Sequence, residues 1–246
     1  MSWVKGRTIV ITGGSSGIGK AIAFAVAGEG GRVVLASRTQ ARLDDGVDQI
    51  RRAGGEAIAH ATDVGDADAV EALMERAVAE FGTIDGLVTA AGLGRFGPLL
   101  EQDRAAVEET VATDLLGTIW AVQSAGRRMA PGSQIITVAS SMAGNPSSTM
   151  ALYASVKSAV VVLSDGIRAE LAQRGIRLSC LLPGGVATHF QDGWGAEETS
   201  EFGVKATDDS GALDLSHVMR ARDIAPAVLF AFDLPERSRG ANLSVV

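Results

Sequence analysis

The sequence predicts an α/β fold: a single Rossmann-type, doubly wound domain with a seven-stranded parallel sheet and helices on both faces. Three observations predict it. Short β-branched segments alternate with longer segments of helical period along the 246 residues. A glycine-rich turn follows the first of these β-branched segments. Neither an internal repeat nor a low-complexity linker divides the chain, so residues 1–246 are expected to form one domain.

Seven strands and one clearly amphipathic helix can be assigned. The strands are expected near residues 7–12, 32–36, 56–61, 84–89, 133–139, 176–182 and 241–245. The helix is expected over residues 66–81, with Asp66 as its N-cap and Gly82 as its stop. Its apolar face consists of Val70, Leu73, Met74, Ala77, Val78 and Phe81. Residues 189–222 break this rhythm, and their Gly, Asp, Glu and Ser content predicts a substrate lid or loop over a site.

Composition and charge exclude several classes of protein. The net charge is −7 and the Lys and Arg residues are scattered among the acids, which argues against a nucleic-acid partner. No apolar segment reaches the roughly 20 residues that cross a bilayer, and no signal region precedes the first strand. Cys180 is the only cysteine, so we expect a cytoplasmic protein without a membrane partner in which Cys180 is a buried packing residue. His60, His189 and His217 lack metal-ligand spacing, and no metal site is expected.

A glycine-rich turn, Thr12-Gly13-Gly14-Ser15-Ser16-Gly17-Ile18-Gly19, lies between the first strand and a helix-like segment. In this order, backbone N–H groups and the positive end of a helix dipole point at one place, which suits a pyrophosphate. The spacing is Gly-x-x-x-Gly-x-Gly rather than Gly-x-Gly-x-x-Gly, so an ordinary glycine-rich turn is the alternative. The position of the turn in the first βα unit favours a dinucleotide site. Its expected cofactor-binding residues are Gly13, Ser15, Ser16, Gly17, Ile18 and Gly19.

The second strand ends in Ser37 and Arg38, without the carboxylate that usually holds the ribose 2′-hydroxyl of NAD. A guanidinium suits a 2′-phosphate in both geometry and charge. The alternative is that Arg38 simply begins a solvated helix. The sequence favours NADP (NADPH) as the cofactor, with Ser37 and Arg38 holding its 2′-phosphate.

Tyr153 and Lys157 are four residues apart at the start of a long helical segment, so they share one helix face. Tyr153 is the only tyrosine of the chain. Ser140 and Ser141 follow the fifth strand, and the carboxyl ends of parallel strands meet at one crevice. These side chains are therefore expected near the glycine-rich turn.

Together these motifs resemble the short-chain dehydrogenase/reductase family over nearly the whole chain. In chain order they are TGGSSGIG at 12–19, Asp63-Val64, Ala91-Gly92, Ser140, Tyr153 with Lys157, and Pro183-Gly184-Gly185-Val186-Ala187-Thr188. The resemblance implies an NADP-dependent oxidoreductase that transfers hydride between nicotinamide and a carbonyl or secondary alcohol. It implies Tyr153 as general acid/base, Lys157 as the residue that holds the nicotinamide ribose and lowers the tyrosine pKa, and Ser140 as the residue that orients the carbonyl.

The resemblance also implies the remaining cofactor contacts and an assembly. Asp63 and Val64 are expected beside the adenine, and Val186 and Thr188 beside the nicotinamide carboxamide. Further cofactor-binding residues are Ala90, Ala91, Gly92, Pro183 and Gly184, together with Tyr153 and Lys157. A small-molecule carbonyl or hydroxy compound is the implied substrate. A homotetramer or homodimer is implied, formed through the helices of residues 101–128 and 151–174.

The chain departs from the family pattern in three places. The usual Asn-Asn-Ala-Gly is Thr89-Ala90-Ala91-Gly92 here, which removes amide side chains that brace the sheet. The catalytic asparagine of the fourth helix is Asp114, which we expect to be catalytic through a relay from its backbone carbonyl to Lys157. Ser140 aligns without a gap, whereas the following Met-Ala-Gly matches Ser141.

Three functions remain open from the sequence. The Ser140, Tyr153 and Lys157 set favours the oxidoreductase. An NADP-binding regulator without turnover and an epimerase or dehydratase on the same fold are the alternatives, because a fold alone does not settle function. The C-terminal run from Phe232 to Val246 is similar to the branch of the family that oxidises serine and related 3-hydroxy acids.

Overall fold

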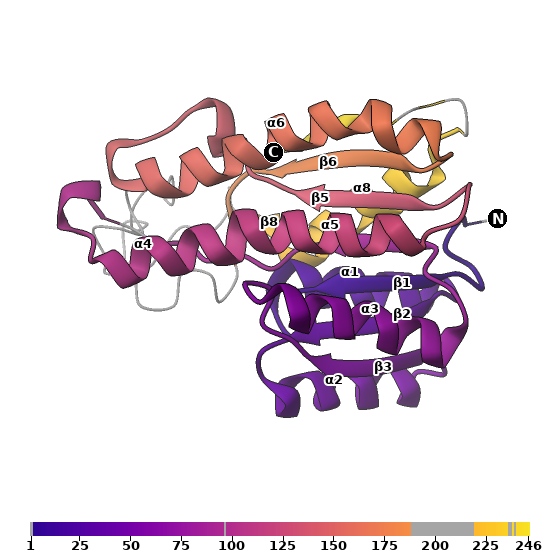
Figure 1. Cartoon of the computed structure of the whole chain (residues 1–246). Helices are drawn as coiled ribbons and strands as arrows, with labels where there is room; N and C mark the ends of the chain where they lie inside the picture. The colour runs from indigo at the N-terminus through magenta and orange to yellow at the C-terminus, as the bar shows by residue number, and fades with distance from the viewer. Residues whose placement is uncertain (1, 96, 188–218, 236–237, 239) are drawn as a thin grey trace, which may run out of the picture.

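Seven parallel strands form one sheet, in the order β3-β2-β1-β4-β5-β6-β9, in the computed structural model of the chain (Figure 1). The strands are β1 (Thr8–Thr12), β2 (Arg32–Ser37), β3 (Glu56–Ala61), β4 (Gly86–Thr89), β5 (Gln134–Val138), β6 (Arg177–Pro183) and β9 (Asn242–Val245). The structure describes residues 2–95, 97–187, 219–235, 238 and 240–246. The predicted fold class and all seven predicted strands are confirmed.

Helices cover both faces of the sheet. They are α1 (Gly17–Gly28), α2 (Gln40–Arg52), α3 (Ala67–Phe81), α4 (Arg104–Thr110), α5 (Gly117–Arg128), α6 (Ala151–Gln173) and α8 (Ala221–Asp233). One buried apolar cluster joins the sheet to α1, α2 and α8, and a second joins it to α3 and α5. Successive residues of a strand point to opposite faces, so Ile9 and Ile11 belong to the first cluster and Val10 to the second. The near-continuous apolar strands follow from this double burial.

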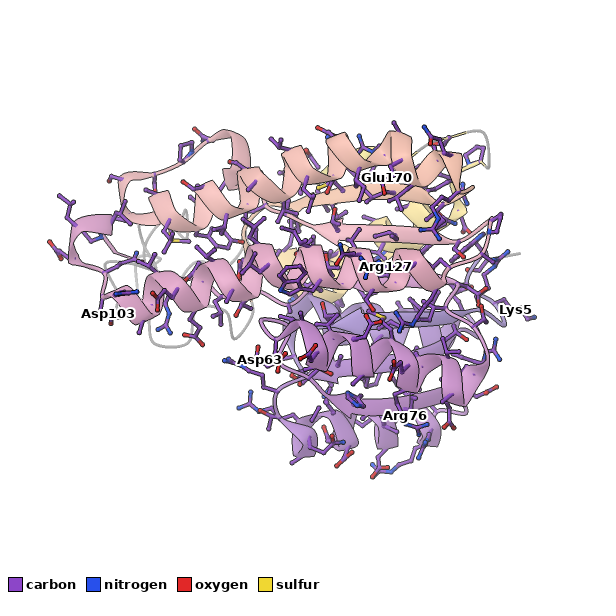
Figure 2. All side chains as sticks on the ribbon, viewed as in Figure 1. Lys5, Asp63, Arg76, Asp103, Arg127 and Glu170 are labelled. Atoms are coloured by element: carbon purple, nitrogen blue, oxygen red, sulfur yellow. The ribbon has the colours of Figure 1, made fainter. Side chains whose placement is uncertain are left out.

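The strand order reverses between β1 and β4, since β1 pairs with β2 on one side and with β4 on the other. Ligand sites of such sheets lie at this switch point, beyond the carboxyl ends of the strands. Figure 2 shows Asp63 at this carboxyl edge, on the loop that follows β3, whereas Lys5 lies at the opposite edge.

The caps of α3 match the sequence prediction. The Asp66 carboxylate accepts hydrogen bonds from the backbone N–H groups of Asp68 and Ala69. Gly82 ends the helix with a φ of 78°, in the left-handed region that glycine adopts without steric cost.

The predicted excursion over 189–222 is wrong at its C-terminal end. Residues 219–222 are regular: β8 (Met219–Arg220) pairs in parallel with β7 (Val186–Ala187), and α8 begins at Ala221. The rest of the predicted lid, residues 189–218, lies outside the described residues.

The segment Ser148–Gln173, which contains α6, is long and apolar enough by length and composition to cross a membrane. This corrects the expectation that no segment of the chain reaches that length. Helix α6 nevertheless buries a tyrosine and a lysine, Tyr153 and Lys157, in its first two turns. Its face carries buried polar groups that hydrocarbon would leave unpaired, as expected for the core helix of a folded domain.

Candidate active site

A cavity of about 430 Å³ opens at the carboxyl ends of the strands. The glycine-rich turn, the loop after β4, the end of β5, the start of α6 and the segment after β6 all contribute to its wall. The predicted site residues that line it are Gly13, Ser16, Gly17, Ile18, Arg38, Ala90, Ala91, Gly92, Ser140, Tyr153, Lys157, Pro183, Gly184 and Val186. Residues far apart in the sequence therefore meet in one cavity, as the sheet topology requires.

The glycine-rich turn leaves no room for side chains at two positions. A Cβ on Gly13, whose φ is +68°, would lie 2.6 Å from the Ala90 carbonyl oxygen. A Cβ on Gly19 would lie 2.3 Å from the carbonyl oxygen of Gly13. Close packing of the turn on β4 and on α1 brings the N-terminus of α1 to the cavity, where Ser16 and Gly17 lie in the wall. This arrangement points backbone N–H groups and the positive helix end into the cavity, as a phosphate site requires.

The end of β2 differs in part from the prediction. Arg38 lines the cavity, but Ser37 does not, and its hydroxyl is buried without a hydrogen-bond partner among the described residues. The reason is that Ser37 is still a strand residue, in register with Ala61 of β3. A second guanidinium, that of Arg42, lines the cavity four residues after Arg38. Arg42 lies in the first turn of α2 (Gln40–Arg52), the helix that follows β2, and this position next to the end of β2 is the signal in the sequence that could have identified it.

Ser140, Tyr153 and Lys157 form one buried cluster in the wall of the cavity. Their exposed fractions are 6%, 6% and 4%. The Ser140 side chain is hydrogen-bonded to Tyr153, and the Lys157 ammonium lies 5.7 Å from the centre of the tyrosine ring. Ser141 begins the 3₁₀ turn η3 (Ser141–Gly144) and is not among the residues that line the cavity. The geometry therefore favours Ser140 over Ser141 as the hydroxyl that faces a ligand.

Asp114 contacts Lys157 directly through its side chain. The carboxylate is fully buried, with its Oδ2 3.3 Å from the Lys157 Nζ, and its Oδ1 accepts a hydrogen bond of 2.7 Å from the Leu93 N–H. Asp114 lies in a π-helical turn, η2 (Val111–Leu116), between α4 and α5. Such turns insert a residue into a helix and often occur at functional sites. The Asp114 backbone carbonyl, expected to relay protons to Lys157, accepts the Thr118 hydroxyl at 3.0 Å.

Burial opposes the expected effect of Lys157 on the pKa of Tyr153. Burial raises the pKa of Tyr153 above its usual value, and the Asp114 carboxylate raises it further. The Lys157 ammonium and the Ser140 hydrogen bond lower the pKa, but they do not offset burial. Lys157 therefore lowers the pKa of Tyr153 as expected, but burial outweighs it and the net direction is upward.

The Lys157 ammonium is stabilised by its neighbours. Burial lowers the pKa of Lys157, but the Asp114 carboxylate and Tyr153 outweigh it, so the net direction is upward. Burial raises the pKa of Asp114, and Lys157 and the Leu93 N–H offset part of that increase. Lys157 Nζ also donates to the Val138 carbonyl at 3.3 Å. The Lys157 ammonium is thus held beside the Tyr153 ring.

Several predicted cofactor residues do not line the cavity. Val64 is buried against the start of α5, where a Cβ on Gly117 would lie 2.6 Å from its Cγ2. The Asp63 carboxylate accepts the Gly65 N–H at 2.9 Å and so closes its own loop. Ser15 and Gly19 are not among the described residues that line the cavity. Thr188 lies outside the described residues.

The altered Thr89-Ala90-Ala91-Gly92 segment is braced from β1. The Thr12 hydroxyl accepts the Ala91 N–H at 3.3 Å, which ties the end of β1 to the turn after β4. The Thr89 hydroxyl is buried and has no hydrogen-bond partner among the described residues.

Sequence reasoning missed other charged groups of the wall. Arg95, in the loop after β4, and Glu109, on α4, line the cavity beside Arg38. Nothing in the local sequence distinguishes Glu109 from its neighbour Glu108, because only the tertiary fold brings one of them to the site.

The single cysteine and His60 lie outside the wall of the cavity. Cys180 is buried beside Ala139 and Val160, as predicted, and burial raises the pKa of its thiol. The Nδ1 of His60 lies 3.0 Å from the Thr62 hydroxyl, while His189 and His217 lie outside the described residues.

Comparison with known proteins gives a consistent result. The family model described as short chain dehydrogenase matches residues 7–199. The chain is 32% identical over 232 residues to the 2,3-dihydro-2,3-dihydroxybenzoate dehydrogenase of Bacillus subtilis (strain 168), covering 92% of this chain and 89% of that protein. It is 33% identical over 222 residues to "Probable oxidoreductase EphD" of Mycobacterium tuberculosis (strain ATCC 25618 / H37Rv), covering 88% of this chain. The match covers only 37% of the length of EphD.

A solved structure extends the similarity to nearly the whole chain. The crystal structure of a short chain dehydrogenase from Burkholderia cenocepacia J2315 in complex with NADP matches with a TM-score of 0.87 and 29% identity. The match covers 98% of this chain and 97% of the other.

Proposed function

Because the chain belongs to the short-chain dehydrogenase family, we propose that it is an NADP-dependent oxidoreductase acting on a carbonyl compound or its secondary alcohol. One observation carries the proposal: a single cavity contains both the glycine-rich turn and the Ser140, Tyr153 and Lys157 cluster. Relatives and structural neighbours support oxidoreductase activity in general.

The residues present fit a dinucleotide. The turn is formed by glycines at which a Cβ would clash, and it places the N-terminus of α1 at the cavity. Ser16 and Gly17 would hold the phosphates, and Lys157 the nicotinamide ribose. The bound nicotinamide supplies or accepts the hydride.

Tyr153 serves as the general acid in the reduction direction. With its pKa raised by burial, the phenol carries its proton at neutral pH and can donate it to the substrate oxygen as that oxygen gains negative charge. The phenolate that remains is stabilised by the Lys157 ammonium, which Asp114 and the Val138 carbonyl hold in place. Ser140, hydrogen-bonded to Tyr153, orients the same oxygen. In the oxidation direction the phenolate takes the hydroxyl proton from the alcohol.

A panel of aldehydes, ketones and 3-hydroxy acids, followed by NADPH absorbance, tests the reaction. At least one compound is expected to drive oxidation of NADPH or reduction of NADP. Tight NADPH binding without turnover across the panel would instead identify a regulator. Conversion of substrate without a net change in absorbance would identify an epimerase or dehydratase.

The preference for NADP is assigned to Arg38. The Burkholderia cenocepacia neighbour was crystallised with NADP, which supports the assignment by similarity. Here Arg38 and Arg42 line the cavity beyond the end of β2. The strand itself ends in Ser37 and Arg38, without the carboxylate that would favour NAD. Two guanidiniums there suit a 2′-phosphate.

Arg38→Gln is expected to weaken NADPH binding by about 10- to 100-fold, because it removes a charge-assisted contact of roughly 1.5 to 3 kcal/mol. NADH binding should change little, since NADH has no 2′-phosphate. Dissociation constants for both cofactors at one salt concentration provide the measurement. Equal losses for the two would show a structural role, and a parent protein that prefers NADH would refute the NADP assignment.

Asp114→Asn is expected to move the pH dependence of alcohol oxidation to lower pH. The Asp114 carboxylate raises the pKa of Tyr153, so removing its charge lowers that pKa and populates the catalytic phenolate at lower pH. Initial oxidation rates measured from pH 6 to 10 give the midpoint in the parent and the variant. An unchanged or higher midpoint would show that Asp114 does not act on the tyrosine.

The location, assembly and remaining cofactor contacts are proposed on family resemblance. We propose a cytoplasmic homotetramer or homodimer without nucleic-acid or membrane partners.

A further inference from the structure

The Glu109 carboxylate bridges two arginines in the wall of the cavity. Its Oε1 accepts from Arg38 at 3.0 Å, and its Oε2 pairs with Arg95 at 2.5 Å. Arg38 follows β2, Arg95 follows β4, and Glu109 lies on α4, so three separate segments meet here. All three side chains line the same cavity as the glycine-rich turn.

Glu109 is ionised and held by its helix. Hydrogen bonds from Arg95 and Arg38 lower the pKa of its carboxyl below the usual value. Helix α4 is anchored by Asp103, whose carboxylate accepts the Ala106 N–H at 2.7 Å. Both arginines, by contrast, are on connecting segments and are about half exposed, with exposed side-chain fractions of 57% and 48%. Glu109 is thus held in place by its helix, whereas the Arg38 and Arg95 side chains are free to change conformation.

We propose that Glu109 competes with the cofactor's 2′-phosphate for Arg38 and thereby sets how strongly the cavity prefers a phosphorylated dinucleotide. The inference rests on the proposed function, in which Arg38 binds that phosphate. A phosphate monoester has more charge and more acceptor oxygens than a carboxylate, so it displaces Glu109 from the guanidinium.

Arg95 lowers the free-energy cost of moving Arg38 from Glu109 to the phosphate. When Arg38 turns to the phosphate, Glu109 retains its contact with Arg95, so no carboxylate is left unpaired. The competition therefore reduces the affinity for the phosphorylated cofactor by a modest factor without abolishing binding. An exposed ion pair contributes little, which corresponds to a factor of about two to five in a dissociation constant.

Glu109→Gln tests the proposal, with Glu108→Gln as the matched control. Glu108 precedes it on the same helix and pairs with Arg104 at 2.7 Å, and neither of these residues lines the cavity. The probes are adenosine 2′,5′-bisphosphate and 5′-AMP, titrated calorimetrically into the full chain. We expect Glu109→Gln to bind the bisphosphate about two- to fivefold more tightly and 5′-AMP unchanged. Glu108→Gln should change neither.

A double variant separates competition from general repulsion. In the Arg38→Gln background, Glu109→Gln should no longer improve binding of the bisphosphate, since no guanidinium remains to be released. A gain that persists in that background, an equal gain for 5′-AMP, or no gain at all would overturn the inference. If the parent binds NADPH normally in these cases, the proposed function stands. If the parent binds neither NADPH nor the bisphosphate, both the inference about Glu109 and the proposed NADP-dependent function are refuted.

Discussion

Tyr153→Phe is expected to lower the turnover number for carbonyl reduction by about 10²- to 10⁴-fold, the usual contribution of a general acid. The change removes the phenolic proton that the raised pKa keeps available at neutral pH. The ring stays, so packing in the buried first turns of α6 is retained and NADPH should still bind. Turnover numbers, NADPH dissociation constants and unfolding midpoints together separate chemistry from folding.

Ser155→Ala is the matched control for Tyr153→Phe. It removes a hydroxyl from the same helix, where Ser155 donates to the Ala151 carbonyl at 2.7 Å, and Ser155 is not in the wall of the cavity. Its turnover should stay within a few-fold of the parent. A Tyr153→Phe protein that also stays within a few-fold would show that another group supplies the proton.

Lys157→Met is expected to destabilise the protein by about 3–5 kcal/mol at pH 7, because it leaves a buried carboxylate without its counter-charge. Asp114 is 0% exposed. Its Oδ2 faces the Lys157 ammonium at 3.3 Å. Urea unfolding of parent and variant gives the difference in free energy of unfolding.

The pH dependence of Lys157→Met gives a second measurement. Burial raises the pKa of Asp114, and without the lysine nothing of opposite charge offsets that increase. The folded state then binds the proton more tightly than the unfolded state, so stability is lost as pH rises through the folded pKa and recovered as pH falls. The deficit against the parent should therefore shrink on acidification from pH 7.

The double variant Lys157→Met with Asp114→Asn is expected to recover much of the lost stability, since it removes the unpaired charge. A deficit below about 1 kcal/mol in the single variant, or no recovery in the double one, would contradict a buried ion pair that depends on both partners.

The elements of the fold could be predicted because their signals are local. Most strands are short, largely apolar runs in their own segments, and α3 carries its caps in its own sequence, Asp66 and Gly82. Tyr153 and Lys157 share a face of α6 because four residues make about one helical turn. Parallel sheet topology then brings the glycine-rich turn and these side chains to one edge.

The sequence by itself therefore determined the fold class, the strands, the glycine-rich turn and the side chains at the centre of the cavity, since local spacing and chain topology specify all of them. Only the tertiary structure decided the electrostatics. Arg38 and Glu109 are 71 residues apart, and a π-helical turn that the sequence did not reveal directs Asp114 onto Lys157. The raised pKa of Tyr153 depends on burial by the surrounding elements. These ion pairs and the pKa of Tyr153 depend on distances between segments that are far apart in the sequence and on burial by them, so no local sequence pattern predicts them.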